Sequence, residues 1–229
     1  MKIAVKVCGI TERGTLEQMK ELEVDYIGLL LAPSKRRVTP SQAGELAGFL
    51  RSEARGFPLG AARSVGVFVN PSREELAETL AAAPLDVVQL HGEEPPELCR
   101  WAADTLGVEV IKALPLAAAG EGGSEADTLA ERIARYAGSV HAVLLDTHDP
   151  VYGGGSGKRF AWERIPEAQE AARQAGIRLL VAGGLSPDNV GRLLDSYTPD
   201  GVDVSSGLET DGRKDADKIK RFVERVKQA

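Results

Sequence analysis

The sequence predicts an α/β protein, a (β/α)8 barrel in which eight strands alternate with eight helices. Short runs rich in Val, Ile and Leu recur along the whole chain. Each run is followed by a longer segment whose apolar residues recur at the spacing of a helix face. Alternating strands and helices favour a parallel sheet with helical crossovers, and a count of eight favours a closed barrel over an open sheet.

The expected strands are short apolar runs bounded by polar or glycine-containing segments. In the first run, the apolar residues Ile3, Val5 and Val7 occupy every second position, as one face of a strand requires. The last run begins at Gly201. In chain order the strands are expected at residues 3–7, 26–31, 64–69, 86–90, 109–113, 142–145, 178–181 and 201–204.

The expected helices lie between these runs and carry apolar residues three or four positions apart. Ser41, Pro96, Pro187 and Asp215 stand at the starts of four of them, where such residue types are favoured. In chain order the helices are expected at residues 16–22, 41–51, 73–82, 96–105, 126–136, 163–175, 187–195 and 215–227. A glycine-rich stretch at residues 120–124 is expected to form a flexible loop before the fifth helix.

Length and composition indicate one globular domain. The chain has 229 residues, of which 43% are hydrophobic and 27% are charged, and it can bury a full core. No long linker or low-complexity tract divides it, so we expect a single barrel domain over residues 1–229. The net charge of −6 argues against nucleic acid or a membrane surface as a partner, but it does not prevent a local basic site for a small anion.

Cysteine usage and the N-terminus indicate the cytoplasm. The two cysteines, Cys8 and Cys99, are too few for a disulfide scaffold and have no metal-ligand spacing with the three histidines. We therefore expect no metal site. Lys6 interrupts the apolar N-terminus, and the longest apolar run, residues 26–33, is too short to span a bilayer. Neither a signal peptide nor a membrane anchor is expected.

The first strand ends at a thiol followed by glycine. Because strand side chains alternate between faces, Ala4, Lys6 and Cys8 are expected on one face. A lysine about 7 Å along the strand would favour the reactive thiolate of Cys8. The alternative is that Cys8 is a small buried apolar residue, and the local sequence by itself favours that alternative.

In a barrel of this type the carboxyl ends of the strands and the loops after them form the active face. The candidate catalytic and binding residues of this chain fall at those positions. They are Cys8 after the first expected strand, residues 34–37 after the second, Gln89 and His91 after the fourth, Asp146 after the sixth, Gly183 and Gly184 after the seventh, and residues 205–207 after the eighth.

Two of these turns suggest a phosphate site. Gly183 and Gly184 follow the seventh expected strand, and Ser205, Ser206 and Gly207 follow the eighth. Backbone N–H groups in this part of a barrel commonly receive a phosphate. Either turn by itself would be explained by a tight bend or a helix cap, and the two together favour phosphate binding.

Seven stretches of the chain together carry a family resemblance. They are residues 6–11, 34–38, 88–92, 145–147, 154–160, 182–190 and 203–207. Taken in this order, they resemble phosphoribosylanthranilate isomerases of tryptophan biosynthesis, and the resemblance covers nearly the whole chain. It implies an intramolecular oxidoreductase that catalyses the Amadori rearrangement of N-(5-phosphoribosyl)anthranilate to 1-(2-carboxyphenylamino)-1-deoxyribulose 5-phosphate, without cofactor or metal.

The resemblance also implies roles for individual residues. Cys8 matches the general base of the family, Asp146 the general acid, and Arg36 the arginine that holds the anthranilate carboxylate, an anion suited to a guanidinium fork. This reverses the interpretation of Cys8 as a buried apolar residue. Asp203 is a candidate for binding sugar hydroxyls, with a helix cap or a pair with Lys6 as the alternatives.

The reaction explains why these residue types are needed. The furanose ring opens by protonation of its ring oxygen, and a proton then leaves C2 of the Schiff base. A thiolate can take a carbon-bound proton, whereas a carboxyl donates near neutral pH only where its surroundings raise its pKa. Asp146 shares its expected strand face with Ala142 and Leu144, which would supply such apolar surroundings.

Other functions are considered beside this one. Indole-glycerol-phosphate synthase would use lysine and glutamate as acid and base, and the bifunctional aminoimidazole sugar isomerase would have aspartate in place of Cys8. A ligand-binding barrel without activity would not need both Cys8 and Asp146. We therefore expect an isomerase whose partner is a small phosphorylated aminosugar, acting as a monomer or homodimer.

Four further features have less specific interpretations. Gln89 and His91 are expected to support the site or the core, Cys99 is expected in the core, and His148 at the surface. Residues 154–157 form a glycine-rich loop that could close over the ligand or be an ordinary flexible turn.

Overall fold

The computed structural model describes residues 2–116, 128–146 and 162–229. Three of the predictions above fall outside these ranges. They concern the loop at residues 120–124, the exposure of His148 and the glycine-rich loop at residues 154–157.

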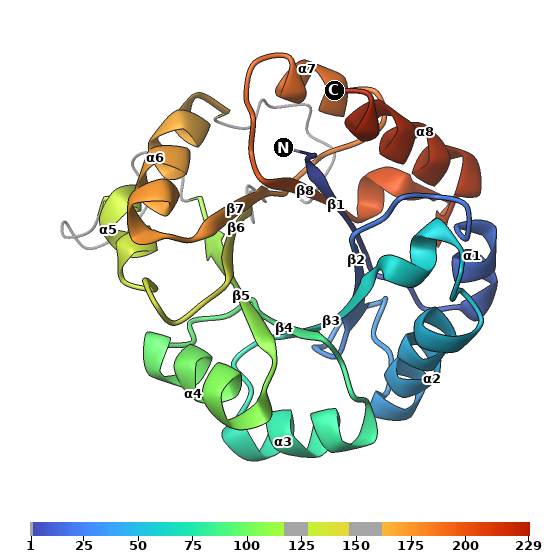
Figure 1. The fold of residues 1–229 in the computed structure, drawn as a ribbon, viewed down its shortest axis with the longest axis horizontal. Coiled ribbons are helices and arrows are strands. Elements are labelled where there is room, and N and C mark those ends of the chain that lie inside the picture. Colours follow the sequence, from blue (N-terminus) through green and yellow to red (C-terminus); the bar gives the residue numbers. More distant parts are fainter. Residues whose placement is uncertain (1, 117–127, 147–161) are drawn as a thin grey trace.

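Eight parallel strands close into a barrel in which each strand pairs with its neighbours in the chain and β1 pairs with β8 (Figure 1). The predicted (β/α)8 fold is confirmed, and every predicted strand is present within two residues of its predicted bounds. The strands are β1 (Ala4–Cys8), β2 (Tyr26–Leu30), β3 (Arg63–Phe68), β4 (Val87–Leu90), β5 (Glu109–Pro115), β6 (Ala142–Asp146), β7 (Arg178–Val181) and β8 (Gly201–Val204).

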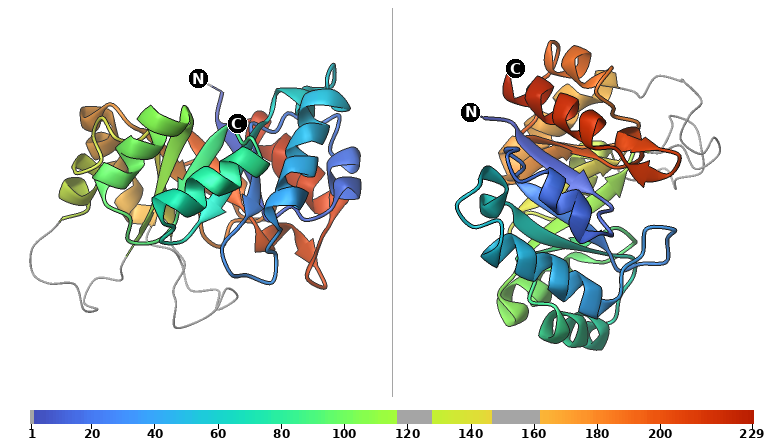
Figure 2. Two further views of the ribbon diagram at one scale, coloured as in Figure 1. Left: turned by 90° about the horizontal axis from the view of Figure 1, so that it is seen from below. Right: turned by 90° about the vertical axis from the view of Figure 1, so that its right-hand side faces the viewer.

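The helices form a ring around the barrel, and both ends of the chain lie at the same end of it (Figures 1 and 2). Lys227 in the last helix donates to the backbone oxygen of Ile3 at 3.1 Å, which joins the two ends. The helices are α1 (Arg13–Gln18), α2 (Pro40–Ser52), α3 (Arg73–Ala82), α4 (Pro96–Leu106), α5 (Leu129–Ala134), α6 (Ile165–Ala175), α7 (Val190–Leu194) and α8 (Ala216–Lys227). Short 3₁₀ turns η1 (Pro58–Ala61), η2 (Trp162–Arg164) and η3 (Ser206–Leu208) accompany them.

Three helices differ from the prediction by three residues or more at one or both ends. The helix predicted at residues 126–136 begins at Leu129, after Thr128, whose side chain caps it by accepting a bond from the Glu131 N–H at 3.2 Å. The helix predicted at residues 16–22 ends at Gln18, because Met19 to Leu22 continue as tight turns with bonds between residues three apart. The helix predicted at residues 187–195 begins only at Val190, because the Asn189 side chain accepts a bond from the Ser186 N–H at 2.8 Å and holds a turn there.

A short hairpin after β8 was not predicted. Strands β9 (Glu209–Thr210) and β10 (Arg213–Lys214) pair antiparallel across a two-residue turn. Asp211 and Gly212 both have positive φ, at 52° and 77°, as the central residues of a type I′ turn require. An Asp-Gly pair is the usual sequence signal for such a turn, so the hairpin could have been read from the chain.

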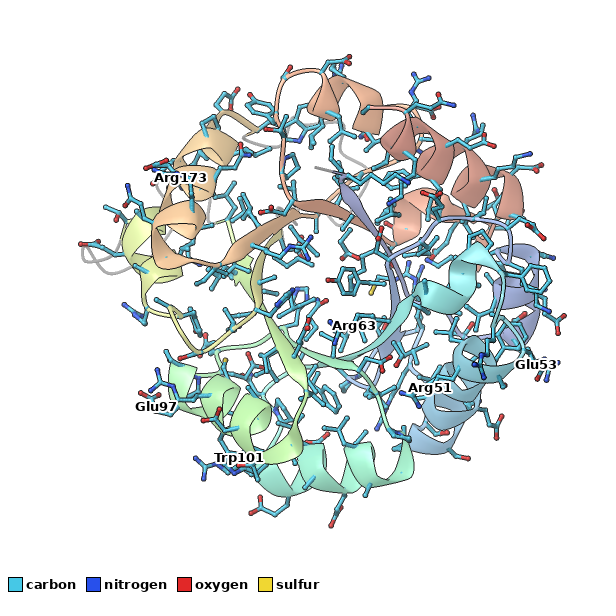
Figure 3. The ribbon with its side chains drawn as sticks, in the orientation of Figure 1. Arg51, Glu53, Arg63, Glu97, Trp101 and Arg173 are labelled. Carbon is cyan, nitrogen blue, oxygen red and sulfur yellow. The ribbon has the colours of Figure 1, made fainter. Side chains whose placement is uncertain are left out.

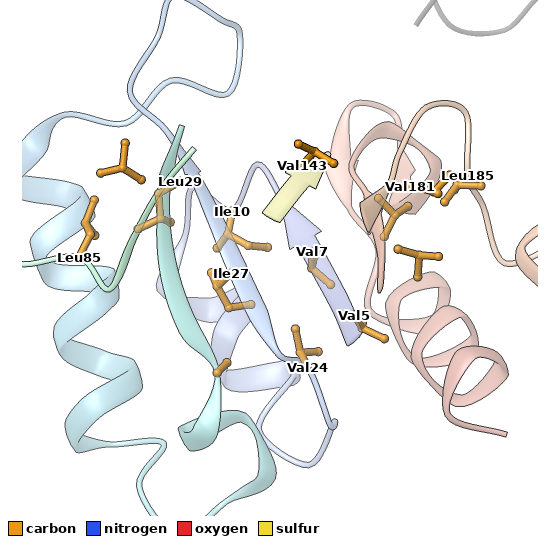
Figure 4. Close-up of a cluster of buried hydrophobic side chains, with 14 of the residues drawn as sticks. Val5, Val7, Ile10, Val24, Ile27, Leu29, Leu85, Val143, Val181 and Leu185 are labelled. Atoms are coloured by element: carbon orange, nitrogen blue, oxygen red, sulfur yellow. The ribbon is translucent and has the colours of Figure 1, made fainter. Parts of the chain in front are cut away.

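Apolar side chains form two layers on either side of the strands. One set lines the barrel interior and includes Tyr26, Val65, Ile111 and Leu144. The larger set lies between the barrel and the helices, and Figure 4 shows part of it around β1 and β2. The predicted burial of Cys99 in this outer layer is confirmed, since it is fully buried on α4.

Most charged side chains lie outside these layers. Arg51, Glu53, Glu97 and Arg173 project from the ring of helices (Figure 3). Arg173, for example, pairs with Glu170 at 2.6 Å on the surface of α6, where such pairs contribute little to stability. Since most charges are at the surface, the few buried charges are the ones that need an explanation.

Within the described ranges, no helix is long and apolar enough to cross a membrane.

Candidate active site

Cys8 ends β1 and is almost fully buried, with 7% of its surface exposed. It lies opposite Gly28 in the register of β1 and β2. A Cβ atom built on Gly28 would lie 2.7 Å from the Cys8 sulfur, a distance that real Cβ atoms do not reach. Glycine at this position therefore makes the space that the thiol occupies.

Lys6 points to the same side of β1 and forms a buried ion pair with Asp203 of β8. The Nζ to Oδ1 distance is 2.9 Å, and the Lys6 side chain is not exposed at all. The two residues are also register partners in the β1 to β8 pairing. Of the alternatives for Asp203, the pair with Lys6 is present in the structure, and among the described residues its hydrogen bond uses Oδ1 of the carboxylate and not Oδ2.

The surroundings of Cys8 pull its pKa in opposite directions. Burial has the largest effect and raises the pKa of the Cys8 thiol, while the nearby charges of Lys6 and Lys214 lower it. The negative charge of Asp203 raises it again, and the pKa ends above its ordinary value. The predicted effect of Lys6 on the thiol is present, but burial outweighs it.

Arg36, in the loop after β2, reaches across to the hairpin after β8. It donates to Glu209 through two parallel bonds, from Nε to Oε1 at 2.5 Å and from Nη2 to Oε2 at 2.8 Å. The side chain of Arg36 passes over Gly9, where an added Cβ would lie 2.6 Å from Arg36 Cδ. Arg36 therefore lies beside the residue that follows Cys8.

Lys214 completes this group from β10. Its Nζ donates to Glu209 Oε1 at 3.1 Å and to the backbone oxygen of Ser205 at 2.9 Å. Burial lowers the pKa of Lys214 more than the neighbouring Glu209 raises it. Burial works to raise the pKa of Glu209, but its bond with Arg36 and the charge of Lys214 bring it down to about 2. Glu209 is therefore ionised throughout the physiological range.

Asp146 ends β6, and β7 and β8 separate that strand from β1 in the closed sheet. Its Oδ2 lies 3.1 Å from His91 Nε2, and His91 Nδ1 lies 3.0 Å from Gln89 Nε2. With the Gln89 amide donating to Nδ1, the ring proton is on Nε2 and is donated to Asp146. The predicted supporting role of Gln89 and His91 thus corresponds to a chain that orients the carboxyl group.

A second buried ion pair holds the loop that carries His91. Lys112 of β5 pairs with Glu94 at 3.0 Å, and both side chains are 1% exposed. Lys112 Nζ also donates to the backbone oxygens of Leu90 and Gly92, the two neighbours of His91, at 3.2 and 2.7 Å. Since a buried pair is costly to break, His91 is held on a rigid support.

The two turns predicted to bind phosphate lie against each other. A Cβ added to Gly207 would lie 1.9 Å from the backbone oxygen of Leu185, in the loop after β7. Gly183 and Gly184 both have positive φ, at 93° and 60°. Ser205 is half-buried, and Ser206 is exposed. The structure therefore brings these five residues to one place at the carboxyl ends of β7 and β8.

Glu209, Lys214 and Lys112 were not predicted as parts of the site. The Asp-Gly signal of the hairpin would have placed Glu209 and Lys214 on facing strands next to the Ser205 turn. Lys112 had no comparable signal, because one lysine within an apolar strand does not reveal its partner. Within the described part of the chain, no group of three or more His, Cys, Asp and Glu residues is arranged to hold a metal ion.

Comparison with known proteins identifies the family. The model of the N-(5'-phosphoribosyl)anthranilate isomerase family matches residues 5–225. The chain belongs to this family. It is 49% identical to N-(5'-phosphoribosyl)anthranilate isomerase of Brevibacillus brevis, over 97% of this chain and 93% of that protein. It is 35% identical to the enzyme of the same name from Bacillus subtilis, over 98% of this chain and 95% of that protein.

Solved structures of the family have the same fold. The phosphoribosyl anthranilate isomerase of Thermotoga maritima superposes with a TM-score of 0.79 at 36% identity, covering 99% of this chain and 100% of that one. A phosphoribosyl anthranilate isomerase in complex with reduced 1-(o-carboxyphenylamino)-1-deoxyribulose 5-phosphate superposes with a TM-score of 0.76 at 33% identity, covering 99% and 100% of the two chains. The sequence resemblance to phosphoribosylanthranilate isomerases is thereby confirmed.

Proposed function

We propose that this isomerase of tryptophan biosynthesis rearranges N-(5'-phosphoribosyl)anthranilate to 1-(2-carboxyphenylamino)-1-deoxyribulose 5-phosphate with Cys8 as base and Asp146 as acid. One observation carries the proposal. In a barrel of this family, a thiol and a carboxyl end two strands at the face where such barrels place their chemistry.

Asp146 acts first in the proposed sequence. It gives a proton to the ring oxygen of the ribose, the bond from that oxygen to C1 breaks, and C1 and the anthranilate nitrogen form a Schiff base. The bond from His91 to Oδ2 fixes the direction of the carboxyl group during this transfer. Positioning the acid in advance lowers the entropy cost of the step.

Cys8 acts second. Its thiolate takes the proton from C2, and the electron pair of that C–H bond forms the enolamine as the Schiff base nitrogen is neutralised. The enolamine then loses its O–H proton and gains one at C1, so that C2 is oxidised to the ketone and C1 is reduced. No external oxidant or reductant is needed. The positive charges of Lys6 and Lys214 lower the pKa of the Cys8 thiol and so favour the thiolate against the effect of burial.

Three groups of residues are proposed to bind the substrate. Arg36 receives the anthranilate carboxylate, and Asp203 accepts bonds from sugar hydroxyls while it pairs with Lys6. The phosphate is held by the adjoining turns of Gly183, Gly184, Ser205, Ser206 and Gly207, which are supported by their close packing at the ends of β7 and β8.

The remaining expectations belong to the same proposal. We infer a single barrel domain that works in the cytoplasm without cofactor or metal, as a monomer or homodimer. The matching chain over residues 5–225 supports one domain. A related structure is described as a monomer generated from the dimeric enzyme of Thermotoga maritima, so both states are known for a relative.

The test is a fluorescence assay with the purified protein and freshly formed phosphoribosylanthranilate. Loss of the substrate signal should accelerate in proportion to protein concentration, and the product should be the 1-deoxyribulose 5-phosphate compound by mass and chromatography. A rate equal to spontaneous decay of the substrate would contradict the proposed function.

A further inference from the structure

The contact between Glu209 and Arg36 has no part in the mechanism described so far. The residues are far apart in the chain, and little of either side chain is exposed, 18% for Arg36 and 7% for Glu209. Paired bonds of this kind between arginine and a carboxylate fix the plane of the guanidinium as well as its position. The contact therefore sets the direction in which Arg36 points.

The bonds use one edge of the guanidinium and leave another. Glu209 takes the side edge formed by Nε and Nη2. The terminal edge, formed by Nη1 and Nη2, presents a second fork of parallel donors of the same shape. Within the described ranges, the side-chain hydrogen bonds of Arg36 go to Glu209 and use Nε and Nη2, not Nη1. A ligand carboxylate can bind at this terminal edge without displacing Glu209.

Glu209 is itself held on several sides. Lys214 donates to its Oε1 at 3.1 Å, and Lys218 of α8 donates to its backbone oxygen at 2.7 Å. The aliphatic part of Arg36 is confined by Gly9, where there is no space for a Cβ. The stem of Arg36 therefore lies against Gly9, the residue after β1, and its head is held by the hairpin after β8.

We propose that Glu209 is a positioning residue that holds the terminal edge of Arg36 ready for the carboxylate of the substrate. This rests on the proposed function, in which Arg36 receives that carboxylate. Binding then needs no ordering of a long flexible side chain, whose immobilisation otherwise weakens affinity. The hairpin that sequence analysis missed thus contributes to substrate specificity through Glu209, without touching the reacting atoms.

The first test is the kinetics of Glu209→Gln, which keeps the shape of the side chain but replaces one acceptor with an NH₂ group facing the donors of Arg36. We expect KM to rise roughly tenfold or more, with kcat changed much less, since a positioning residue for binding acts before chemistry. Glu209→Asp keeps the charge and should recover part of the loss. Glu170→Gln, which removes a surface pair with Arg173, is the matched control and should leave both constants unchanged.

The second test measures binding by calorimetry with two ligands. One is reduced 1-(o-carboxyphenylamino)-1-deoxyribulose 5-phosphate, and the other is the same compound without the carboxylate. Glu209→Gln should weaken the first by roughly tenfold and the second hardly at all. Equal weakening of both ligands, or unchanged affinity for both, would overturn the proposal. Should Glu209→Gln not fold by circular dichroism, the same comparison with Glu209→Asp decides, with a smaller but still selective loss expected.

A double variant separates this inference from the proposed function. If Glu209 acts through Arg36, then Glu209→Gln should add little to the KM of Arg36→Lys, whereas independent roles would give additive effects. Additivity, with a fully active wild-type protein, would reject the positioning role and leave the isomerase function intact. An inactive wild-type protein would instead reject the function itself.

Discussion

Gly28 of β2 gives the Cys8 thiol its space. The two are register partners, and a Cβ on Gly28 would lie 2.7 Å from Sγ and 3.0 Å from Cys8 Cα. A larger residue at this position would have to displace the sulfur, because both strands are fixed by the closed barrel. The glycine of β2 is therefore as much a part of the proposed site as the cysteine of β1.

The first prediction is that Gly28→Ala lowers kcat on the order of 10- to 100-fold, because a displaced thiolate is no longer aligned with the C–H bond at C2 of the substrate. Overpacking should also cost about 1–3 kcal/mol of the free energy of unfolding. Steady-state kinetics and urea unfolding measure the two effects.

Gly66→Ala is the matched control for that variant. Its Cβ would lie 2.6 Å from Leu85 Cδ1 and 2.9 Å from Phe68, away from the site. It should lose stability to a similar extent and keep kcat. Equal loss of kcat in the two variants would show that overpacking, and not the position of the thiol, causes the effect.

The second prediction concerns Lys6→Met. Removing Lys6 leaves the 8% exposed Asp203 without its buried partner, which should cost about 3–5 kcal/mol of the free energy of unfolding. Lys6 also lowers the pKa of the Cys8 thiol, so the variant should move the pH midpoint of Cys8 alkylation by iodoacetamide upward. Both changes are expected together.

Two further variants separate these effects. Lys6→Met with Asp203→Asn removes both charges and should recover part of the stability lost by Lys6→Met. Lys2→Met breaks an exposed pair with Glu23 and should change neither the melting temperature nor the alkylation midpoint. A lowered melting temperature with an unshifted midpoint in Lys6→Met would leave Lys6 with a structural role only.

The third prediction is the pH dependence of the wild-type protein. Since the pKa of Cys8 is raised above its ordinary value, alkylation of Cys8 should have a midpoint above that of a free thiol, and kcat/KM should increase as the pH rises toward it. Because the pKa of Cys8 is higher in the folded than in the unfolded state, the folded protein holds this proton more tightly. The contribution to the free energy of unfolding is therefore full at neutral pH and is lost as the pH rises through the pKa of the folded state.

Peptide mapping of the alkylated protein distinguishes the two cysteines. Burial raises the pKa of Cys99 to about 12, so it should remain unmodified while Cys8 reacts. An alkylation midpoint for Cys8 below that of a free thiol would show that Lys6 and Lys214 outweigh burial, contrary to this account.

The fourth prediction is that dialysis against a metal chelator leaves kcat and KM unchanged. The proposed acid and base need no metal, and the described residues contain no cluster suited to one. Assays before and after dialysis, with and without added divalent metal ions, measure the effect. Activity lost to the chelator and regained with metal would contradict the proposal.

The fold could be predicted because its signals are local. Each strand of the barrel is a short apolar run, and each helix has its own periodicity, so counting them was sufficient. The bounds were less exact where side chains intervene. Asn189 delays the start of α7 by bonding to Ser186, and nothing in the apolar pattern indicates such a bond.

The candidate site could be predicted only in part. Residues at strand ends, such as Cys8, follow from the chain because the barrel brings those ends together. Contacts between side chains from distant segments do not. Arg36 meets Glu209, and Lys112 meets Glu94, only through the three-dimensional packing, and neither pair was predicted. The pair of Lys6 with Asp203 was one of the alternatives that the sequence left open for Asp203, and the structure contains it.

The most direct test of the central claim is the turnover of Cys8→Ser and Asp146→Asn, measured by fluorescence with circular dichroism as the check of folding. Each substitution keeps the size of the side chain and removes the base or the acid. We expect kcat to fall on the order of two decades or more in each variant, with the fold retained. Turnover close to that of the wild-type protein in either folded variant would contradict the role proposed for that residue.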